Sequence, residues 1–182
     1  MEIIVDSDIR LETVKEIHAD EIFNLTERNR EYLKKWLPWV KYTKSRKDTL
    51  NFLEESIERM KSKTGLQTTI FYKGKTAGLI GLVEISYLRN QTEIGYWLGE
   101  EFTGKGIMTK SCGALTDYTF LNTVLKRINI LCDINNEKSR MIPERLGYYN
   151  QGILERDGIV NGEFVAHYHF VMWRDKWRKR KN

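Results

Sequence analysis

The sequence is most constrained at residues 93–111, where a strand pattern passes through two glycines directly into a helical pattern. The stretch reads EIGYWLG, then EEFTGKG, then IMTKS. A helix that begins in this way leaves the N–H groups of its first turn unpaired and carries partial positive charge there. Gly104 and Gly106 put no side chain in front of those groups, and Lys105 adds a cation. The junction therefore predicts an anion site at a helix N-terminus.

Three known phosphate-binding patterns can be compared with this loop. The P-loop pattern is missing. The dinucleotide pattern G-x-G-x-x-G fits in part, but Thr109 stands in place of the third glycine, and Asp133 lies further along than the usual ribose-binding acid. The acetyl-CoA pyrophosphate loop, (Q/R)-x-x-G-x-(G/A), fits as E-F-T-G-K-G. A glycine-rich turn without a ligand is also compatible with these residues alone.

The remaining periodicity predicts one mixed α/β domain over residues 1–182. A mostly antiparallel central sheet of about seven strands is flanked by helices. We expect helices over 15–29, 29–40, 46–63, 106–124 and 136–147. We expect strands over 9–14, over 66–86 as a hairpin turning at 73–75, over 91–99 and 127–134, and over 148–156 and 164–173 as a final pair.

Composition narrows the setting of the protein. The chain has a net charge of +5, and much of the excess lies in the tail at about 174–182. The tail is interpreted either as solvated or as a contact for an acidic partner such as RNA or the ribosome. The apolar run 77–83 is too short to cross a bilayer, and residues 1–10 do not resemble a secretory signal, so no membrane is expected. Cys112 and Cys132 suggest no disulfide scaffold, which favours the cytoplasm.

Four stretches together resemble the GCN5-related N-acetyltransferase (GNAT) superfamily, and more narrowly its RimJ/RimL type, which acetylates ribosomal-protein N-termini. They are NREYLKKWLPWV, TEIGYWLGEEFTGKGIMTKS, INNEKSRMIPERLGY and NGEFVAHYHFVMWRDKW. They span most of the chain in the family's order. The resemblance implies the GNAT fold with a splayed sheet, acetyl-CoA as the acetyl donor, no metal, and an acceptor amine, expected to be a protein N-terminus.

The resemblance also implies a cofactor site. Backbone groups near Trp97 and Leu98 would pair with pantetheine, Asn135 would contact the same arm, and Ser139 would lie by the sulfur and protonate the departing thiolate. The pyrophosphate would be held by the N–H groups of Gly104, Lys105, Gly106, Ile107, Met108 and Thr109. Without the resemblance, Asn135 and Asn136 fit helix capping equally well.

Two positions depart from the family pattern. Glu101 stands where the loop usually begins with Gln or Arg, and an acid is unfavourable there unless its side chain points away. Pro143 stands where many relatives place a tyrosine acid. Its ring also crowds the carbonyl four residues earlier, that of Ser139. Ser139 is then the remaining candidate acid.

The resemblance makes Glu93 the candidate general base, with Glu84 as a second candidate. A cross-strand ion pair is the alternative role for Glu93. An α-amine, with a reference pKa of about 7.7–8.0 against about 10.4 for lysine, is easier to deprotonate by about 3.5 kcal/mol. A chain without an obvious strong base therefore favours acetylation of an N-terminal α-amine.

Other features favour structural roles. Cys112 and Cys132 are expected in the core, His18 on a helix surface, and His167 with His169 on one strand face without a third metal ligand. The aromatic segment 32–42 is either core or a wall of the acceptor cleft. Acetylation of a small amine such as a polyamine or antibiotic, CoA binding without catalysis, and RNA binding stay open as alternatives. Exposed strands at 148–173 favour a homo-oligomer.

Overall fold

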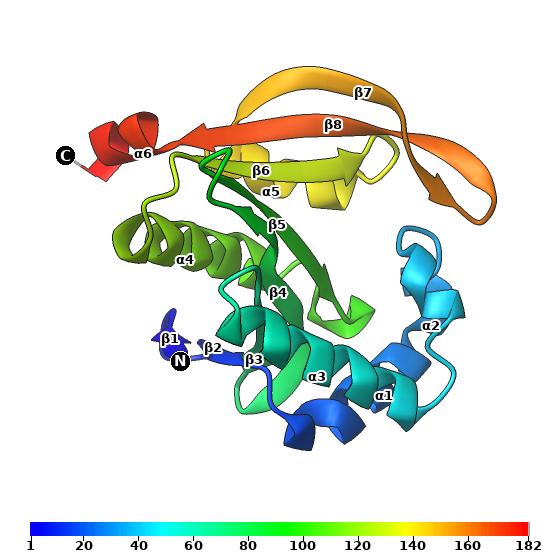
Figure 1. The fold of residues 1–182 in the computed structure, drawn as a ribbon. Helices are drawn as coiled ribbons and strands as arrows, with labels where there is room; N and C mark the ends of the chain where they lie inside the picture. Colours follow the sequence, from blue (N-terminus) through cyan, green and yellow to red (C-terminus); the bar gives the residue numbers. More distant parts are fainter. Residues whose placement is uncertain (182) are drawn as a thin grey trace.

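The computed structural model describes residues 1–181, in which eight strands form one sheet (Figure 1). The order across the sheet is β1-β2-β3-β4-β5-β6-β8-β7, and every neighbouring pair is antiparallel except β5 and β6. The strands are β1 (Glu2–Ile4), β2 (Ile9–Thr13), β3 (Leu66–Tyr72), β4 (Lys75–Ser86), β5 (Gln91–Leu98), β6 (Arg127–Asp133), β7 (Tyr149–Val160) and β8 (Glu163–Trp173).

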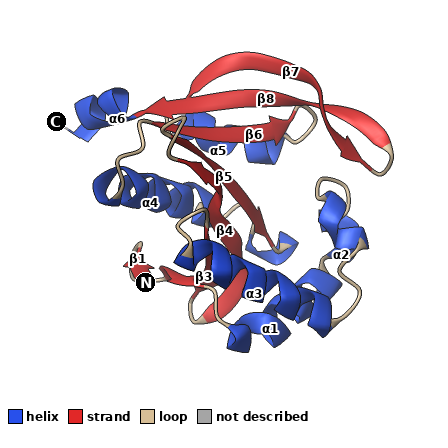
Figure 2. Ribbon diagram, viewed as in Figure 1, coloured by secondary structure: helices blue, strands red, loops and turns tan. Residues whose placement is uncertain are grey.

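Helices pack on both faces of the sheet (Figure 2). They are α1 (Ala19–Arg28), α2 (Arg30–Leu33), α3 (Arg46–Lys61), α4 (Ile107–Asn122), α5 (Glu137–Arg145) and α6 (Arg174–Lys181). Successive strand residues point to opposite faces. Accordingly Leu79 packs with Ile22 of α1 and Leu53 of α3, whereas Ile80 belongs to the larger core that contains Ile107 and Leu115 of α4. No helix within residues 1–181 combines the length and apolar character needed to span a bilayer.

The predicted fold class and order of elements are confirmed, with local differences. Strand β1 was not expected. The helix expected over 15–29 begins with a 3-10 turn at Glu16–His18 before α1. The segment 29–40 divides into the short α2 and a second 3-10 turn, Pro38–Lys41, because Pro38 lacks the N–H that would continue a helix.

The sheet divides between β5 and β6. Only three residue pairs join these strands in parallel: Gln91 with Arg127, Thr92 with Ile128, and Glu93 with Asn129. Strand β5 then continues to Leu98 alongside β4, and β6 continues to Asp133 alongside β8. Beyond Glu93, the main-chain groups of β5 on the side away from β4 therefore face a gap and not a neighbouring strand.

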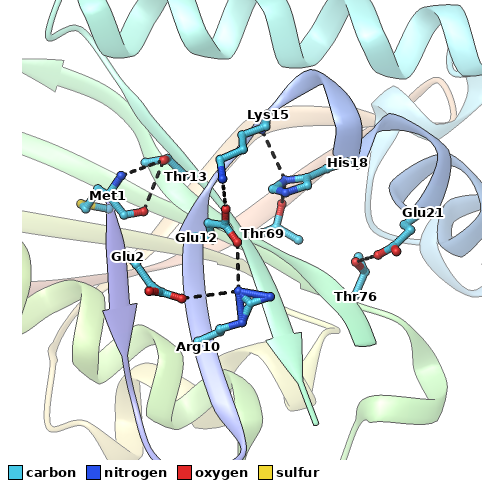
Figure 3. A network of polar contacts seen from close by, with 10 residues as sticks. All are labelled: Met1, Glu2, Arg10, Glu12, Thr13, Lys15, His18, Glu21, Thr69 and Thr76. Atoms are coloured by element: carbon cyan, nitrogen blue, oxygen red, sulfur yellow. Dashed lines mark hydrogen bonds and ion pairs between the residues drawn. The ribbon is translucent and has the colours of Figure 1, made fainter. Parts of the chain in front are cut away.

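A polar network ties the N-terminal strands to the first helical turns (Figure 3). His18 is 7% exposed, and its Nδ1 lies 3.0 Å from Thr69 Oγ1 and accepts from the Lys15 N–H at 3.3 Å. The prediction that His18 lies on a helix surface is therefore wrong. Its partner on β3 is 51 residues away in sequence, so local periodicity could not reveal the contact.

The basic tail is partly anchored. The Arg174 guanidinium donates to the carbonyl oxygens of Phe120, Thr123 and Leu125 at the end of α4. Trp177 is buried against Phe120, and its Nε1 donates to the Asp117 carboxylate at 2.6 Å. Helix α6 is therefore part of the packed structure, while Lys176, Arg178 and Lys179 stay exposed.

Candidate active site

The glycine loop before α4 is shaped by left-handed backbone. Gly104 and Gly106 have φ of +75° and +72°, and Gly106 is the N-cap of α4 with no hydrogen bond from a capping side chain. A Cβ at either glycine would meet nothing within 4 Å. The conformation therefore favours glycine, and the space in front of the first turn is open. The amides at the start of α4 are available to an anion.

A cavity of about 400 Å³ lies at this helix start, bounded by β5, α4, α5 and the α2 region. All the predicted cofactor residues except Lys105 and Asn135 line it. The lining residues are Tyr32, Leu33, Trp36, Leu37, Tyr96, Trp97, Leu98, Phe102, Thr103, Gly104, Gly106, Ile107, Met108, Thr109, Asn136, Lys138, Ser139, Met141, Ile142 and Arg145. The sheet division therefore opens onto one continuous hollow that ends at the helix N-terminus.

Lys105 and Glu101 turn away from this cavity. The Lys105 ammonium donates to the Glu101 carbonyl at 2.7 Å and lies over the ring of Phe102. The Glu101 carboxylate lies beside Gly99, with Oε2 2.8 Å from the place of a Cβ on that glycine. The acid at the first loop position therefore lies outside the lining, and so does the Lys105 side chain.

Asn136 takes the place predicted for Asn135. The Asn136 side chain lines the cavity and caps α5 by accepting the Ser139 N–H at 3.1 Å. Asn135 is exposed, outside the lining, and its N–H donates to the Asp133 carboxylate. The contact of Asn135 with pantetheine stays a prediction, but Asn136 is the asparagine that lines the cavity, and the sequence does not specify which of the two begins the helix.

Ser139 lines the cavity, and its hydroxyl lies beside two polar atoms. Its Oγ is 3.4 Å from Tyr96 Oη and 3.4 Å from Cys132 Sγ. Burial raises the pKa of the Tyr96 phenol well above its usual range, and burial also raises the pKa of the Cys132 thiol. Both groups stay protonated at neutral pH, so Cys132 is not an activated nucleophile. Tyr96 is a residue that the sequence reasoning missed, although strand alternation already separated its face from that of Trp97.

Glu93 occupies the paired part of β5, outside the lining of the cavity. Burial raises the pKa of its carboxyl, and the negative charges of Asp157 and Glu84 raise it further. A carboxylate with a raised pKa is better suited to accept a proton at neutral pH. Because Glu93 lies outside the lining, a proton from the cavity would reach it through water.

The histidines of β8 bind separate partners. His167 Nδ1 lies 3.0 Å from the Asp157 carboxylate, and His169 Nε2 lies 3.0 Å from Asn129 Oδ1. Burial lowers the pKa of His169, and the Arg127 guanidinium lowers it further. Within the described residues, no group of three His, Cys, Asp or Glu side chains could hold a metal.

A second cavity, of about 580 Å³, lies on the α3 face of the sheet. It shares Leu37, Tyr96 and Trp97 with the first. Its further lining residues include Trp39, Tyr42, Asp48, Phe52, Glu55 and Arg59. Trp36 lines the first cavity and Trp39 the second, and the rings of Trp39 and Trp97 lie 5.8 Å apart. The two cavities therefore meet at the division of the sheet, at Leu37, Tyr96 and Trp97.

Comparisons with known proteins identify the family of the chain. The family model "Acetyltransferase (GNAT) domain" matches residues 8–149. The putative ribosomal N-acetyltransferase YdaF of Bacillus subtilis (strain 168) is 31% identical over 180 residues, 97% of each chain. The ribosomal-protein-serine acetyltransferase of Escherichia coli (strain K12) is 26% identical over 88% of this chain and 89% of its own.

Solved structures share the fold. The microcin C7 self-immunity acetyltransferase MccE, in complex with acetyl-CoA and AMP, has a TM-score of 0.90 at 29% identity, covering 93% of this chain and 94% of its own. RimL, the ribosomal L7/L12 α-N-protein acetyltransferase, has a TM-score of 0.93 at 24% identity, covering 97% and 99%. Family model, relatives and fold agree, and the chain therefore belongs to the GNAT acetyltransferases, with RimJ/RimL-type enzymes among its relatives.

Proposed function

We propose that this acetyltransferase moves the acetyl group of acetyl-CoA to the N-terminal α-amine of a protein, as ribosomal-protein acetyltransferases do. The observation that carries the proposal is the meeting of two cavities at Tyr96 and Trp97, with an uncapped helix N-terminus in the first. The two relatives named as ribosomal-protein acetyltransferases support a protein acceptor.

The residues of the first cavity fit acetyl-CoA. The N–H groups of the loop and of the first turn of α4, from Gly104 to Thr109, would hold the pyrophosphate. Main-chain groups of Trp97 and Leu98 would pair with the pantetheine arm, and Asn136 would approach that arm in place of Asn135. Lys138 and Arg145, which line the same cavity, add positive charge for phosphate groups.

The chain's own residues then have separate tasks. Acetyl-CoA supplies an activated acetyl thioester, so no enzyme nucleophile is required. The main-chain N–H groups of β5 beyond Glu93 polarise the thioester carbonyl. Glu93 takes the proton of the attacking amine through water as the C–N bond forms. Ser139 gives its hydroxyl proton to the thiolate released when the C–S bond breaks and regains a proton from water, to which Glu93 returns the amine proton.

A thiol-release assay with matched acceptors tests the proposal. One peptide has a free α-amine and no lysine, a second has a blocked α-amine and an internal lysine, and the third acceptor is spermidine. We expect turnover with the first peptide only. Two results would contradict the proposed acceptor. One is turnover with the lysine peptide alone, and the other is no turnover with any free α-amine peptide across a wide panel of N-terminal residues.

The catalytic assignment is tested by Ser139→Ala. General acids typically contribute about 100-fold or more, so kcat should fall by about that factor while acetyl-CoA affinity is kept. Ser7→Ala, at an exposed turn position, is the matched control and should leave kcat unchanged. A Ser139→Ala enzyme with the full kcat would remove Ser139 from the mechanism.

A small amine is the second candidate acceptor. Two observations favour it: the similarity to MccE, an acetyltransferase of microcin self-immunity, and the aromatic lining of the second cavity, where Asp48 and Glu55 supply carboxylates. With an aminonucleoside added to the assay above as a fourth acceptor, faster turnover of spermidine or of the aminonucleoside than of every peptide would decide for it.

We also propose a cytoplasmic location, a ribosome contact through α6, and self-association through the β7–β8 hairpin. Lys176, Arg178 and Lys179 present positive charge on α6. Exposed apolar side chains on the hairpin include Ile159 and Phe164. Replacing the three basic residues with Gln should weaken salt-sensitive ribosome association. Analytical sedimentation of Ile159→Lys and of wild type compares their oligomeric states, and the variant should self-associate less.

A further inference from the structure

Pro143 leaves a main-chain carbonyl of the active site without its helical donor. Helix α5 continues from Glu137 to Arg145 with Pro143 inside it. In an α-helix the N–H of residue 143 would donate to the carbonyl of residue 139. Proline has no N–H, and its ring crowds that carbonyl. The Ser139 carbonyl, which belongs to the candidate catalytic serine, must therefore find another donor.

Tyr96 supplies that donor from a different element. Its hydroxyl, at the end of a β5 side chain, donates to the Ser139 carbonyl at 3.1 Å. A phenol has one proton, so Tyr96 Oη turns its lone pairs to the Ser139 hydroxyl, whose Oγ lies 3.4 Å away. The same phenol oxygen thus contacts both the main chain and the side chain of Ser139.

The surroundings keep the phenol in this state. Tyr96 packs against the main core, and Cys132 Sγ lies 3.8 Å from its Oη. The raised pKa of the phenol agrees with a hydroxyl that holds its proton throughout the working pH range. Tyr96 lines both cavities, so its ring also forms part of the wall where they meet.

We propose that Tyr96 is a positioning residue for Ser139: its hydroxyl replaces the helical hydrogen bond that Pro143 removes and fixes the serine hydroxyl at the cavity. Tyr96 and Pro143 are therefore energetically coupled. The coupling is a property of the fold, and only its effect on turnover rests on the proposed function.

A thermal double-mutant cycle tests the coupling without any substrate. Tyr96→Phe leaves the carbonyl without a donor and should lower Tm by roughly 3–10 °C. Pro143→Ala restores a main-chain N–H, so in that background the same Tyr96→Phe change should lower Tm by less than about 2 °C. Equal losses of Tm in the two backgrounds would overturn the proposal.

Thr68→Val is the matched control for this cycle. Thr68 Oγ1 also donates to a main-chain carbonyl, that of Ile80, at 2.7 Å, but it lies on β3 and is buried. Its loss of Tm should be the same in the wild-type background and in the Pro143→Ala background. Should Tyr96→Phe not yield folded protein, a folded Tyr96→Phe/Pro143→Ala double variant supports the coupling, and failure of both variants to fold overturns it.

Kinetics then separate positioning from mere stability. At a temperature where all variants are folded, Tyr96→Phe should lower kcat by about tenfold, with the KM for acetyl-CoA kept within about twofold. In the Ser139→Ala background it should add no further loss, and Pro143→Ala should restore part of the kcat of Tyr96→Phe. A full additional loss in Ser139→Ala overturns the positioning role. If the wild-type protein is inactive with every acceptor, the proposed function is wrong. The thermal cycle alone then tests the coupling between Tyr96 and Pro143.

Discussion

At the scale of single residues, Glu93 is placed where its charge is costly. Burial, Asp157 and Glu84 raise its folded pKa. The folded state therefore holds the proton more tightly than the unfolded state. Its contribution to stability is full below the ordinary carboxyl pKa and is lost as the pH rises through the raised value.

Glu93→Gln should accordingly raise Tm at pH 7.5, and this advantage should vanish near pH 4. Thermal unfolding at the two pH values measures this advantage, with Glu163→Gln, at the exposed first position of β8, as control. The variant should also lose turnover, since glutamine cannot accept the amine proton. A Tm at pH 7.5 equal to or below that of wild type would show that the charge is well compensated.

His18 predicts an opposite dependence on acid. Burial lowers the pKa of its imidazole, and the Lys15 charge lowers it too. The unfolded state therefore binds the proton first as the pH falls through about 6.5, and stability decreases from there downward. His18→Asn should reduce the difference in Tm between pH 7.5 and pH 5.5. Part of that difference in Tm should remain in the variant, because the pKa of His169 is also lowered in the folded state. An unchanged difference would exclude His18 as a source.

At the scale of elements, the loop before α4 allows a matched pair of glycine variants. Gly106 and Gly74 have φ of +72° and +78°, and a Cβ at either would meet nothing within 4 Å. Alanine in this left-handed region costs about 1–2 kcal/mol at both positions. Only Gly106→Ala should also weaken acetyl-CoA binding, measured by calorimetry, because Gly74 lies in the β3–β4 turn. Equal affinities in the two variants would place the cofactor elsewhere.

The end of α4 depends on a second element, α6. Arg174 carries three charge-assisted hydrogen bonds to main-chain carbonyls there. Arg174→Ala should destabilise the protein by about 2–3 kcal/mol in denaturant titration. Arg178→Ala, exposed on the same helix, should stay within about 0.5 kcal/mol of wild type. Similar values for the two variants would mean that solvent replaces the Arg174 contacts.

Elements were predictable where the signal was local. The loop glycines, α4 and the β3–β4 hairpin follow from residues within a few positions of one another. The side chains that complete the cavity were less accessible. Asn136 instead of Asn135 depends on where α5 begins, and the hydrogen bond of Tyr96 to Ser139 joins residues 43 apart. Sequence periodicity predicts which face a residue occupies, but not which distant group it meets.

At the scale of the whole molecule, the two halves of the sheet are joined by three residue pairs of β5 and β6. A ligand in the gap would link them and stabilise the folded state. At acetyl-CoA concentrations about 100 times Kd, the gain is about 2.7 kcal/mol, or roughly 5–10 °C in Tm. Amide exchange should slow at residues 94–98. NAD at the same concentration is the control, and an equal shift with NAD would favour general dinucleotide binding.

The fastening of α6 to α4 affects how the basic tail can be studied. Deleting residues 174–181 would remove positive charge from the surface. It would also remove Arg174 and Trp177, whose hydrogen bonds hold α6 against α4, the helix whose first turn lines the first cavity. If the shortened enzyme fails to bind ribosomes, the cause could then be either damage to the first cavity or loss of the basic surface. Neutralising only Lys176, Arg178 and Lys179 separates the two effects, because those side chains are exposed and the contacts of Arg174 and Trp177 with α4 are kept.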